Sequence, residues 1–196
     1  MSLIIPPFYE YFHHLGIDPG SVNTGLAIFR VNSRSLKIEK ITPITMQVPR
    51  LIAYNPFDEE FVVEKAIRYE KLLDTITEVI QTYGVVRVSC ESSYYNPKTP
   101  QVYGVLIAIV NLLRHRLLQI NQNIVFTIHP PRTVKQFVGA EVFANDQDKT
   151  KKSVLDALNK IDEIRLNTDI ELEFLSDHAI DAMAIGYIDL KKGLSL

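Results

Sequence analysis

The fold is decided by residues 15–28, which read LGIDPGSVNTGLAI. A short apolar segment ends in the carboxylate of Asp18, a turn rich in glycine and asparagine follows, and a second apolar segment begins. This pattern predicts a β-hairpin whose first strand carries Asp18 to its own end. An acid at the edge of a sheet can meet acids that other elements deliver to the same edge, and two such partners occur far downstream.

The composition is that of one globular domain. The chain has 196 residues, of which 46% are apolar and 22% are charged, so it is long enough to bury a core. The formal net charge of -2 excludes a global attraction to nucleic acid, and any such binding must come from a local basic patch. Cys90 is the only cysteine, which excludes intrachain disulfides and a cysteine-rich zinc site. This usage fits a reducing compartment, and we expect a cytoplasmic protein.

The chain carries no sequence signal for a membrane span or for a second domain. The most apolar segment, residues 102–113, is shorter than a membrane span and is followed by Arg114, His115 and Arg116. The N-terminus lacks the basic start and the long apolar run of a signal peptide. We therefore expect an N-terminal arm over residues 1–13, a single domain over residues 14–196, and no membrane partner.

The apolar periodicity predicts an α/β fold. Three early strands are followed by alternating helices and strands, which indicates a mixed sheet flanked by helices. Residues 42–57 contain three prolines and are expected to be irregular. The expected strands cover residues 14–18, 25–31, 36–41, 85–91 and 123–129, and the expected helices cover residues 57–82, 99 to at least 117, 131–138, 148–160 and 176–191.

Acidic residues stand out at the ends of the predicted elements. Asp18 ends the first strand, and Glu91 ends a later one. In the last helix, His178 lies three residues before Asp181 and Asp177 lies four before it, so either pair shares a helical face. The face of Asp181 is otherwise apolar, and a carboxylate there is costly unless something neutralises it. A divalent cation would do so, because Mg²⁺ and Mn²⁺ prefer carboxylate oxygens.

Each of these residues also has a purely structural interpretation. The tripeptide that begins at Asp18 is common in turns, and Glu91 could be a plain strand end. The helix dipole explains Asp177 at a helix N-terminus, and His178 could be a surface histidine. The combination, with Asp181 on an apolar face, is more specific than any one part.

These residues fall in motifs that are similar to those of a known family. The motifs are residues 16–21 with 24–25, residues 90–92, residues 95–98 with 104–110, residues 134–139 with 148–152, and residues 181–185. In this order they resemble the RuvC family of Holliday junction resolvases, within the ribonuclease H-like superfamily. The resemblance implies a ribonuclease H-like mixed sheet, with three antiparallel strands and then parallel strands, flanked by helices.

The resemblance also implies a metal-dependent, structure-selective endodeoxyribonuclease. Such an enzyme resolves four-way DNA junctions by paired nicks through two-metal phosphodiester hydrolysis, in DNA recombination and repair. The catalytic and metal-binding residues that it assigns are Asp18, Glu91, His178 and Asp181, with two Mg²⁺ or Mn²⁺ ions per active site. Asp177 adjoins His178 and stays an alternative fourth ligand.

A basic cluster and two tyrosines are candidates for DNA contact. Phosphate contacts would supply affinity and strong salt dependence, although a solvated charged face has the same composition. Tyr94 and Tyr95 follow the second acid, where they could stack on bases, wedge between them or pack in the core. The basic residues are Arg132, Lys135, Lys149, Lys151 and Lys152.

Branched DNA and a second copy of the chain are the expected partners. A four-way junction has near two-fold symmetry, so two cuts need two sites, which a C₂ homodimer supplies. By resemblance, the helix that starts at Thr99 is the best interface candidate, although its apolar stripe would look the same in a core.

Two other classes of function stay open. Actin-like and sugar-kinase-like ATPases also begin with a Gly-Ile-Asp-x-Gly loop, but they need two such lobes, and 196 residues are too few for both. The second alternative is a non-catalytic ribonuclease H-like module that binds DNA or protein. The presence of every candidate ligand argues against that alternative.

Overall fold

A five-stranded mixed sheet organises the chain. The computed structural model describes residues 9–20, 22–47, 59–95, 97, 100–143 and 146–194, without the side chains of residues 59–65, 101 and 194. The strand order is β3-β2-β1-β4-β5, with β1 to β3 antiparallel and β4 and β5 added in parallel, as predicted. The strands are β1 (Tyr11–Asp18), β2 (Asn23–Asn32), β3 (Ile38–Gln47), β4 (Val85–Glu91) and β5 (Val125–His129).

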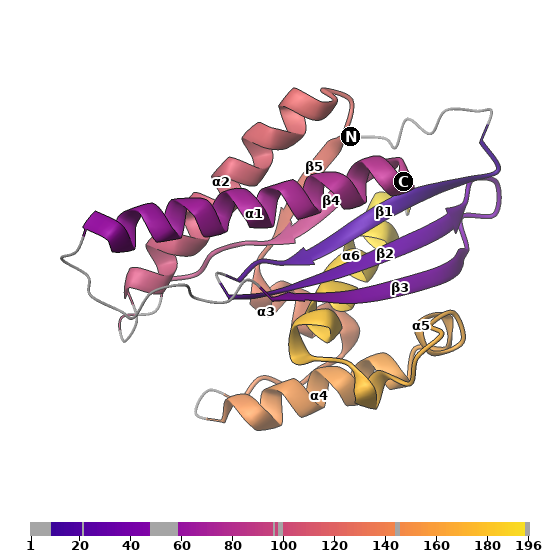
Figure 1. Cartoon of the computed structure of the whole chain (residues 1–196). Helices are drawn as coiled ribbons and strands as arrows, with labels where there is room; N and C mark the ends of the chain where they lie inside the picture. Colours follow the sequence, from indigo (N-terminus) through magenta and orange to yellow (C-terminus); the bar gives the residue numbers. More distant parts are fainter. Residues whose placement is uncertain are drawn as a thin grey trace.

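Helices cover both faces of this sheet (Figure 1). α1 and α2 lie on one face, and α6 crosses the other face with α3 and α4 against it and α5 against β3. The helices are α1 (Glu59–Tyr83), α2 (Pro100–Ile120), α3 (Pro131–Val138), α4 (Gln147–Asn159), α5 (Asp162–Arg165), the 3₁₀ helix η1 (Leu172–Phe174) and α6 (Asp177–Leu194).

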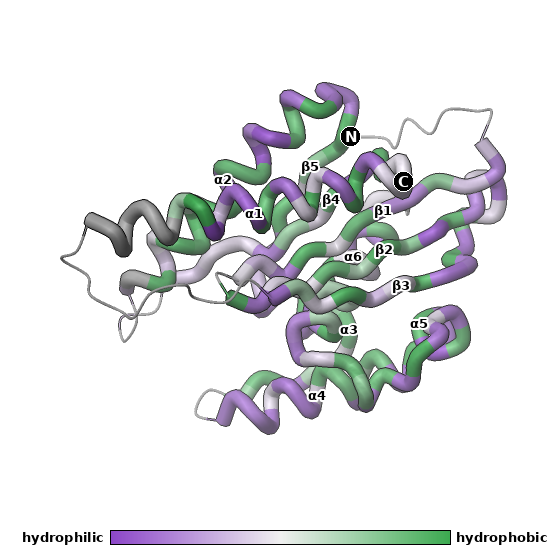
Figure 2. The backbone as a smooth tube through the Cα atoms, viewed as in Figure 1, coloured by the Kyte–Doolittle hydropathy of each residue, from purple (hydrophilic) through white to green (hydrophobic). Residues whose placement is uncertain are grey.

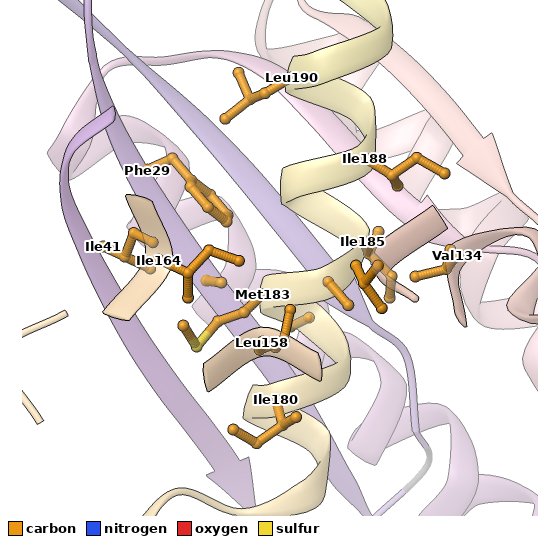
Figure 3. Close-up of a cluster of buried hydrophobic side chains, with 14 of the residues drawn as sticks. Phe29, Ile41, Val134, Leu158, Ile164, Ile180, Met183, Ile185, Ile188 and Leu190 are labelled. Atoms are coloured by element: carbon orange, nitrogen blue, oxygen red, sulfur yellow. The ribbon is translucent and has the colours of Figure 1, made fainter. Parts of the chain in front are cut away.

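Each face of the sheet buries its own apolar cluster, because side chains alternate along a strand. In β2, Leu26 and Ile28 belong to the cluster of α1 and α2, whereas Ala27 and Phe29 belong to the cluster of α6. Figure 2 shows apolar residues along the strands and along α6. Figure 3 shows the α6 cluster, in which α6 side chains meet residues of β2, β3, α3, α4 and α5.

The same alternation decides which polar side chains face α6. In β1 the cluster of α1 and α2 takes Leu15 and Ile17, which leaves His14 and Asp18 on the α6 face. β4 follows the same rule, and its last residue on that face is Glu91. The period of the strands thus places two acids of the predicted site on one side of the sheet.

The first strand is longer than the sequence predicts. β1 begins at Tyr11 and takes in the last residues of the N-terminal arm expected over residues 1–13. The physical reason is that Phe12 is buried in the α6 cluster and pairs with Val31 of β2. Residues 1–8 of the expected arm lie outside the described part of the chain.

The segment expected to be irregular, residues 42–57, begins as a strand instead. β3 continues to Gln47, and Pro43 within it pairs with Ala27. Proline is tolerated there because β3 is an edge strand, so its missing N–H removes no bond to a further strand. Residues 48–58 lie outside the described part, as does Thr99, so the predicted starts of α1 and α2 stay predictions. The short helices α5 and η1 were not predicted.

α2 is longer than the apolar segment that the sequence singles out. Residues Val102–Ile120 are long and apolar enough, by length and composition only, to cross a membrane. Core helices pass the same test, and one face of α2 packs Ile109, Leu113 and Leu117 into the cluster shared with α1 and the sheet. This packing is that of a helix that covers a sheet.

Candidate active site

The ends of two parallel strands bring the first two predicted acids together. β1 and β4 are neighbours, with Ile17 of β1 opposite Cys90 of β4. Asp18 is the last residue of β1, and Glu91 is the last residue of β4. Asp18 is buried and Glu91 is half-buried, so both carboxyl groups sit at a partly desolvated edge of the sheet.

Two glycines let α6 approach this edge closely. A Cβ atom at Gly25 of β2 would lie 1.8 Å from the backbone oxygen of His178. A Cβ atom at Gly16 of β1 would lie 2.3 Å from the backbone oxygen of Ala182. No larger residue fits beneath the helix at either position without displacing it. The close approach delivers His178 and Asp181 to the acids of the strands.

His178 contacts Asp18 directly. The Nδ1 atom of His178 lies 2.6 Å from the Oδ2 atom of Asp18. This hydrogen bond raises the pKa of His178, and burial opposes it. The Nδ1–H group of His178 donates to the carboxylate, and the raised pKa means that the cationic imidazole is favoured beside the acids.

The pKa values of the other two acids, Glu91 and Asp181, are both raised. Burial raises the pKa of Asp181 to about 6, and the charge of Asp18 adds to the effect. Burial also raises the pKa of Glu91 well above its usual value, with further contributions from Asp18 and Asp181. The positive charge of Lys135 opposes both shifts. Three carboxyl groups therefore interact in one partly desolvated place, where bound cations would favour their ionised forms.

The chemistry of these donors fits hard divalent cations, although the side chains do not form a closed coordination shell. Within the described part of the chain, no group of three or more His, Cys, Asp or Glu side chains is arranged to hold a metal ion. One oxygen of Asp18 is taken by His178 in this arrangement. The carboxylates themselves are of the type that Mg²⁺ and Mn²⁺ bind, and burial together with their mutual repulsion raises the pKa of Glu91 and of Asp181, which a bound cation would oppose.

The contacts distinguish the two candidates for the fourth ligand. Asp177 turns toward α4, where its Oδ2 atom lies 2.8 Å from Nζ of Lys151. His178 instead turns toward Asp18. The arrangement therefore favours His178 over Asp177 as a member of the acidic cluster.

The acidic cluster opens into a cleft of about 870 Å³. Its walls carry three of the predicted DNA-binding cations, Arg132 and Lys135 of α3 and Lys151 of α4, together with Tyr94. Acidic and basic side chains line the same cleft, and this combination suits a phosphodiester, because cations can hold the phosphates of a nucleic acid.

Three residues predicted to contact DNA do not line this cleft. Lys149 and Lys152 line a neighbouring hollow of about 340 Å³, where Lys149 also pairs with Asp146. Tyr95 lies against the ring of Tyr103. Tyr94 and Tyr95 are 54% and 61% exposed, so neither is packed in the core.

The cleft residues that sequence reasoning missed include Val142 and Phe143, which lie between α3 and α4. The signal that could have found them is an apolar pair inside a polar loop. Such a pair in a loop has no partner within its own element, so it must pack on a neighbour or stand exposed.

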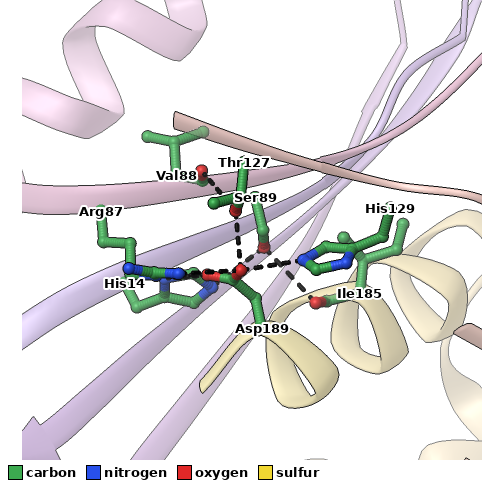
Figure 4. Close-up of polar contacts among 8 residues, drawn as sticks. All are labelled: His14, Arg87, Val88, Ser89, Thr127, His129, Ile185 and Asp189. Atoms are coloured by element: carbon green, nitrogen blue, oxygen red, sulfur yellow. Dashed lines mark hydrogen bonds and ion pairs between the residues drawn. The ribbon is translucent and has the colours of Figure 1, made fainter. Parts of the chain in front are cut away.

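A buried polar cluster beneath α6 was also missed (Figure 4). The carboxylate of Asp189 in α6 accepts hydrogen bonds from Arg87 of β4 and from Thr127 and His129 of β5. Burial opposes ionisation of Asp189, but the bonds from His129 and Arg87 hold its pKa below the usual value. The cluster fixes the C-terminal half of α6 against β4 and β5.

The mixed sheet with acids at adjacent strand ends, completed by a late helix, defines the ribonuclease H-like class of nucleases. The chain belongs to the RuvC family: the family model described as crossover junction endodeoxyribonuclease RuvC matches residues 14–188. A search of the curated proteins finds no match.

Solved structures agree on the fold. RuvC of Thermus thermophilus, in complex with a Holliday junction substrate, is 16% identical, with a TM-score of 0.62 over 93% of this chain and 96% of that chain. The Holliday junction resolvase of fowlpox virus is 14% identical, with a TM-score of 0.58 over 92% and 99%. The yeast mitochondrial Holliday junction resolvase is 15% identical, with a TM-score of 0.56 over 97% and 85%.

Proposed function

We propose that this protein is a structure-selective endodeoxyribonuclease that resolves four-way DNA junctions by paired nicks. The observation that carries the proposal is a cleft lined both by Asp18, Glu91 and Asp181 and by the cations of α3 and α4. The chain that forms this cleft belongs to the RuvC family. Two of the similar structures are described as complexes with Holliday junction DNA, which supports branched DNA as the substrate.

The residues that would hold two divalent cations are Asp18, Glu91 and Asp181, with His178. When bound, Mg²⁺ or Mn²⁺ would supply an activated water and stabilise the negative charge of the leaving oxygen. Asp18 lies between these groups electrostatically, because its charge raises the pKa of both Glu91 and Asp181, and it would help to hold the cations. The hydrogen bond uses Nδ1 of His178 and Oδ2 of Asp18, so Nε2 of a neutral His178 and Oδ1 of Asp18 would be the atoms able to hold a cation while that bond persists.

The cations of the cleft would bind and orient the DNA backbone. Lys135 is close enough to Glu91 and Asp181 to affect the pKa of each, so it can hold a phosphate next to the scissile bond. Arg132 lies on the same helix, and Lys151 comes from α4. These contacts position the strand without reading its sequence.

A junction with two equivalent cutting points favours a homodimer with one active site in each protomer. The support in this chain is that α2 keeps several large apolar side chains exposed. They include Val102, Ile107, Leu112 and Leu118. Sedimentation that finds only monomer at micromolar concentration would count against the dimer.

The test is cleavage of a synthetic four-way junction in Mg²⁺ or Mn²⁺, with a linear duplex of the same sequence as substrate control. We expect the wild-type protein to nick the junction and spare the duplex. Asp18→Asn should abolish nicking and leave junction binding largely intact. Asp169→Asn, which changes an exposed acid paired with Lys40 on β3, is the matched control and should cut normally.

Two outcomes would overturn the proposal. One is an Asp18→Asn variant that cuts at the wild-type rate. The other is a wild-type protein that cuts neither DNA in either metal, which would favour a non-catalytic module.

A further inference from the structure

We propose that Phe143, supported by Val142, is a stacking surface that recognises an unstacked base at the branch point of the DNA. The inference rests on the proposed function and adds a specificity-determining residue to it. Both residues lie in the loop between α3 and α4, and both line the cleft that holds the acidic cluster.

The backbone of Phe143 is hydrogen-bonded on both its N–H and its carbonyl, while its side chain is partly exposed to solvent. Its N–H donates to Oγ1 of Thr150 at 2.9 Å, and its carbonyl accepts from the N–H of Asp146 at 3.2 Å. Thr150 is itself buried in the first turns of α4. Two residues earlier, the N–H of Glu141 donates to Oγ of Ser153 at 2.7 Å. The backbone at Glu141 and Phe143 is therefore anchored to α4, which holds the ring of Phe143 at the cleft.

An exposed phenylalanine in a charged cleft needs an explanation, because burial of an aromatic ring stabilises a protein substantially. Phe143 is 37% exposed and Val142 is 51% exposed. The cleft also holds the aromatic ring of Tyr94, which comes from the segment after β4. Two aromatic side chains from different elements thus face one cleft.

The surroundings identify the occupant as a nucleotide. Arg132, Lys135 and Lys151 line the same cleft and complement phosphates, whereas an apolar ring complements the face of a base. Bases inside a duplex are covered on both faces by their neighbours. Only an unpaired or unstacked base can lie on Phe143, so this contact would favour branched over linear DNA.

The experiment measures binding in the non-cleaving Asp18→Asn background. A four-way junction carries 2-aminopurine at the branch point, and the linear duplex carries it at the matching position. Phe143→Ala should weaken junction binding by about 5- to 150-fold, the equivalent of one base stack, and leave duplex binding unchanged. It should also change the 2-aminopurine fluorescence of the bound junction.

Two further variants separate stacking from folding. Phe143→Tyr keeps an aromatic face and should restore junction affinity. Phe137→Ala removes a phenylalanine of similar exposure, 41%, that lies against Tyr187 away from the cleft, and it should bind as the parent does. Phe143→Ala should fold as its parent does, with a thermal midpoint lowered no more than that of Phe137→Ala, since the ring is not part of either core cluster.

Unchanged junction affinity and fluorescence in Phe143→Ala would overturn the stacking role while wild-type nicking still stood. Equal loss on junction and duplex would overturn it as well, because a general contact does not select branched DNA. A changed oligomeric state with unchanged DNA binding would assign the ring to a contact between copies instead. A wild-type protein without any preference for the junction would overturn this inference together with the proposed function.

Discussion

The Nδ1 atom of His178 lies 2.6 Å from a carboxylate oxygen of Asp18, although the two residues are 160 positions apart in the chain. The contact joins the first turn of α6 to the end of β1. The candidate site therefore depends on how α6 docks across the sheet as much as on the acids themselves. Docking can be perturbed without touching an acid.

A substitution at Gly25 tests directly how the packing of α6 on the sheet affects the site. A methyl group there would overlap the backbone of His178, so Gly25→Ala should push the start of α6 away from β2. We expect a loss of stability of about 1–3 kcal/mol, the usual cost of overpacking, and a larger loss of nicking activity. Chemical denaturation and junction cleavage, measured side by side, check this prediction.

Gly104 is the matched control for that substitution. A Cβ atom added there meets nothing within 4 Å, and the position lies inside α2. Gly104→Ala should retain activity and gain up to about 1 kcal/mol of stability from helix propensity. Normal activity in Gly25→Ala would show that the site tolerates a shift of α6.

The buried pair of Arg87 and Asp189 should be strongly coupled. Arg87→Met leaves the Asp189 carboxylate buried without its main cation, and we expect a loss of about 3–5 kcal/mol. Adding Asp189→Leu removes the uncompensated charge and should recover a large part of that loss. Urea denaturation of the two single variants and the double variant gives the coupling energy. If the effects of the two substitutions on the free energy of unfolding are additive, Arg87 and Asp189 are not a coupled pair.

Acid should destabilise the fold through His14. Burial lowers the pKa of His14 to about 3, against the raising effect of Asp189 and with smaller lowering effects of Arg87 and His129. The folded protein keeps His14 neutral, whereas the unfolded chain binds a proton below the ordinary value of 6.5. Folding stability therefore falls as the pH drops from 6.5 toward 3, by up to about 1.4 kcal/mol per pH unit for this one proton.

The prediction for His14 is checked by comparing how steeply folding stability depends on pH in the wild-type protein and in His14→Leu. His14→Leu should be less stable at neutral pH, because Ser89 loses a hydrogen-bond partner, but its stability should depend less steeply on pH. The raised pKa values of Glu91 and Asp181 act in the opposite direction, and they cancel in the comparison. His115→Gln, at an exposed position, should keep the wild-type slope. Identical slopes for wild type and His14→Leu would refute the prediction.

The slope of DNA affinity against salt concentration should depend on Lys151, which lines the cleft, and on its neighbour Lys152, which lines the adjacent hollow. Lys151→Glu with Lys152→Glu should weaken junction binding and reduce the slope of log K against log salt by about 0.9 for each phosphate that the variant no longer neutralises. Fluorescence anisotropy at several salt concentrations measures the slope. Lys40→Glu, on the edge strand β3, is the control. An unchanged slope in the double variant would show that Lys151 and Lys152 do not contact DNA phosphates.

Local patterns in the sequence account for the part of the site that could be predicted. Two short-range features belong to this part: the hairpin turn after Asp18 and the three-residue spacing of His178 and Asp181. The alternation of side chains along a strand predicts the side of the sheet on which Asp18 lies, and helix geometry predicts that His178 and Asp181 share a face. The same strands indicate a mixed sheet, whereas the antiparallel and then parallel arrangement is implied by the family resemblance. Pro43 misled the prediction because its tolerance depends on β3 being an edge strand, which is a property of the whole sheet.

The remaining features depend on long-range packing. Arg87 and Asp189 are 102 residues apart, and nothing in either segment identifies the other as its partner. The place of Phe143 in the cleft depends on hydrogen bonds between its loop and Thr150 in α4. Asp177 and His178 could not be told apart by spacing, because the choice depends on Lys151 of α4 and Asp18 of β1.

The central claim is that Asp18, Glu91 and Asp181 together hold divalent cations. Anomalous diffraction from crystals of the protein soaked in Mn²⁺ tests it most directly. We predict two anomalous peaks about 3.5–4 Å apart among these three carboxylates, and their loss in Asp18→Asn crystals. A map with no manganese at these carboxylates, from crystals of protein that cuts junctions in the same buffer, would contradict it.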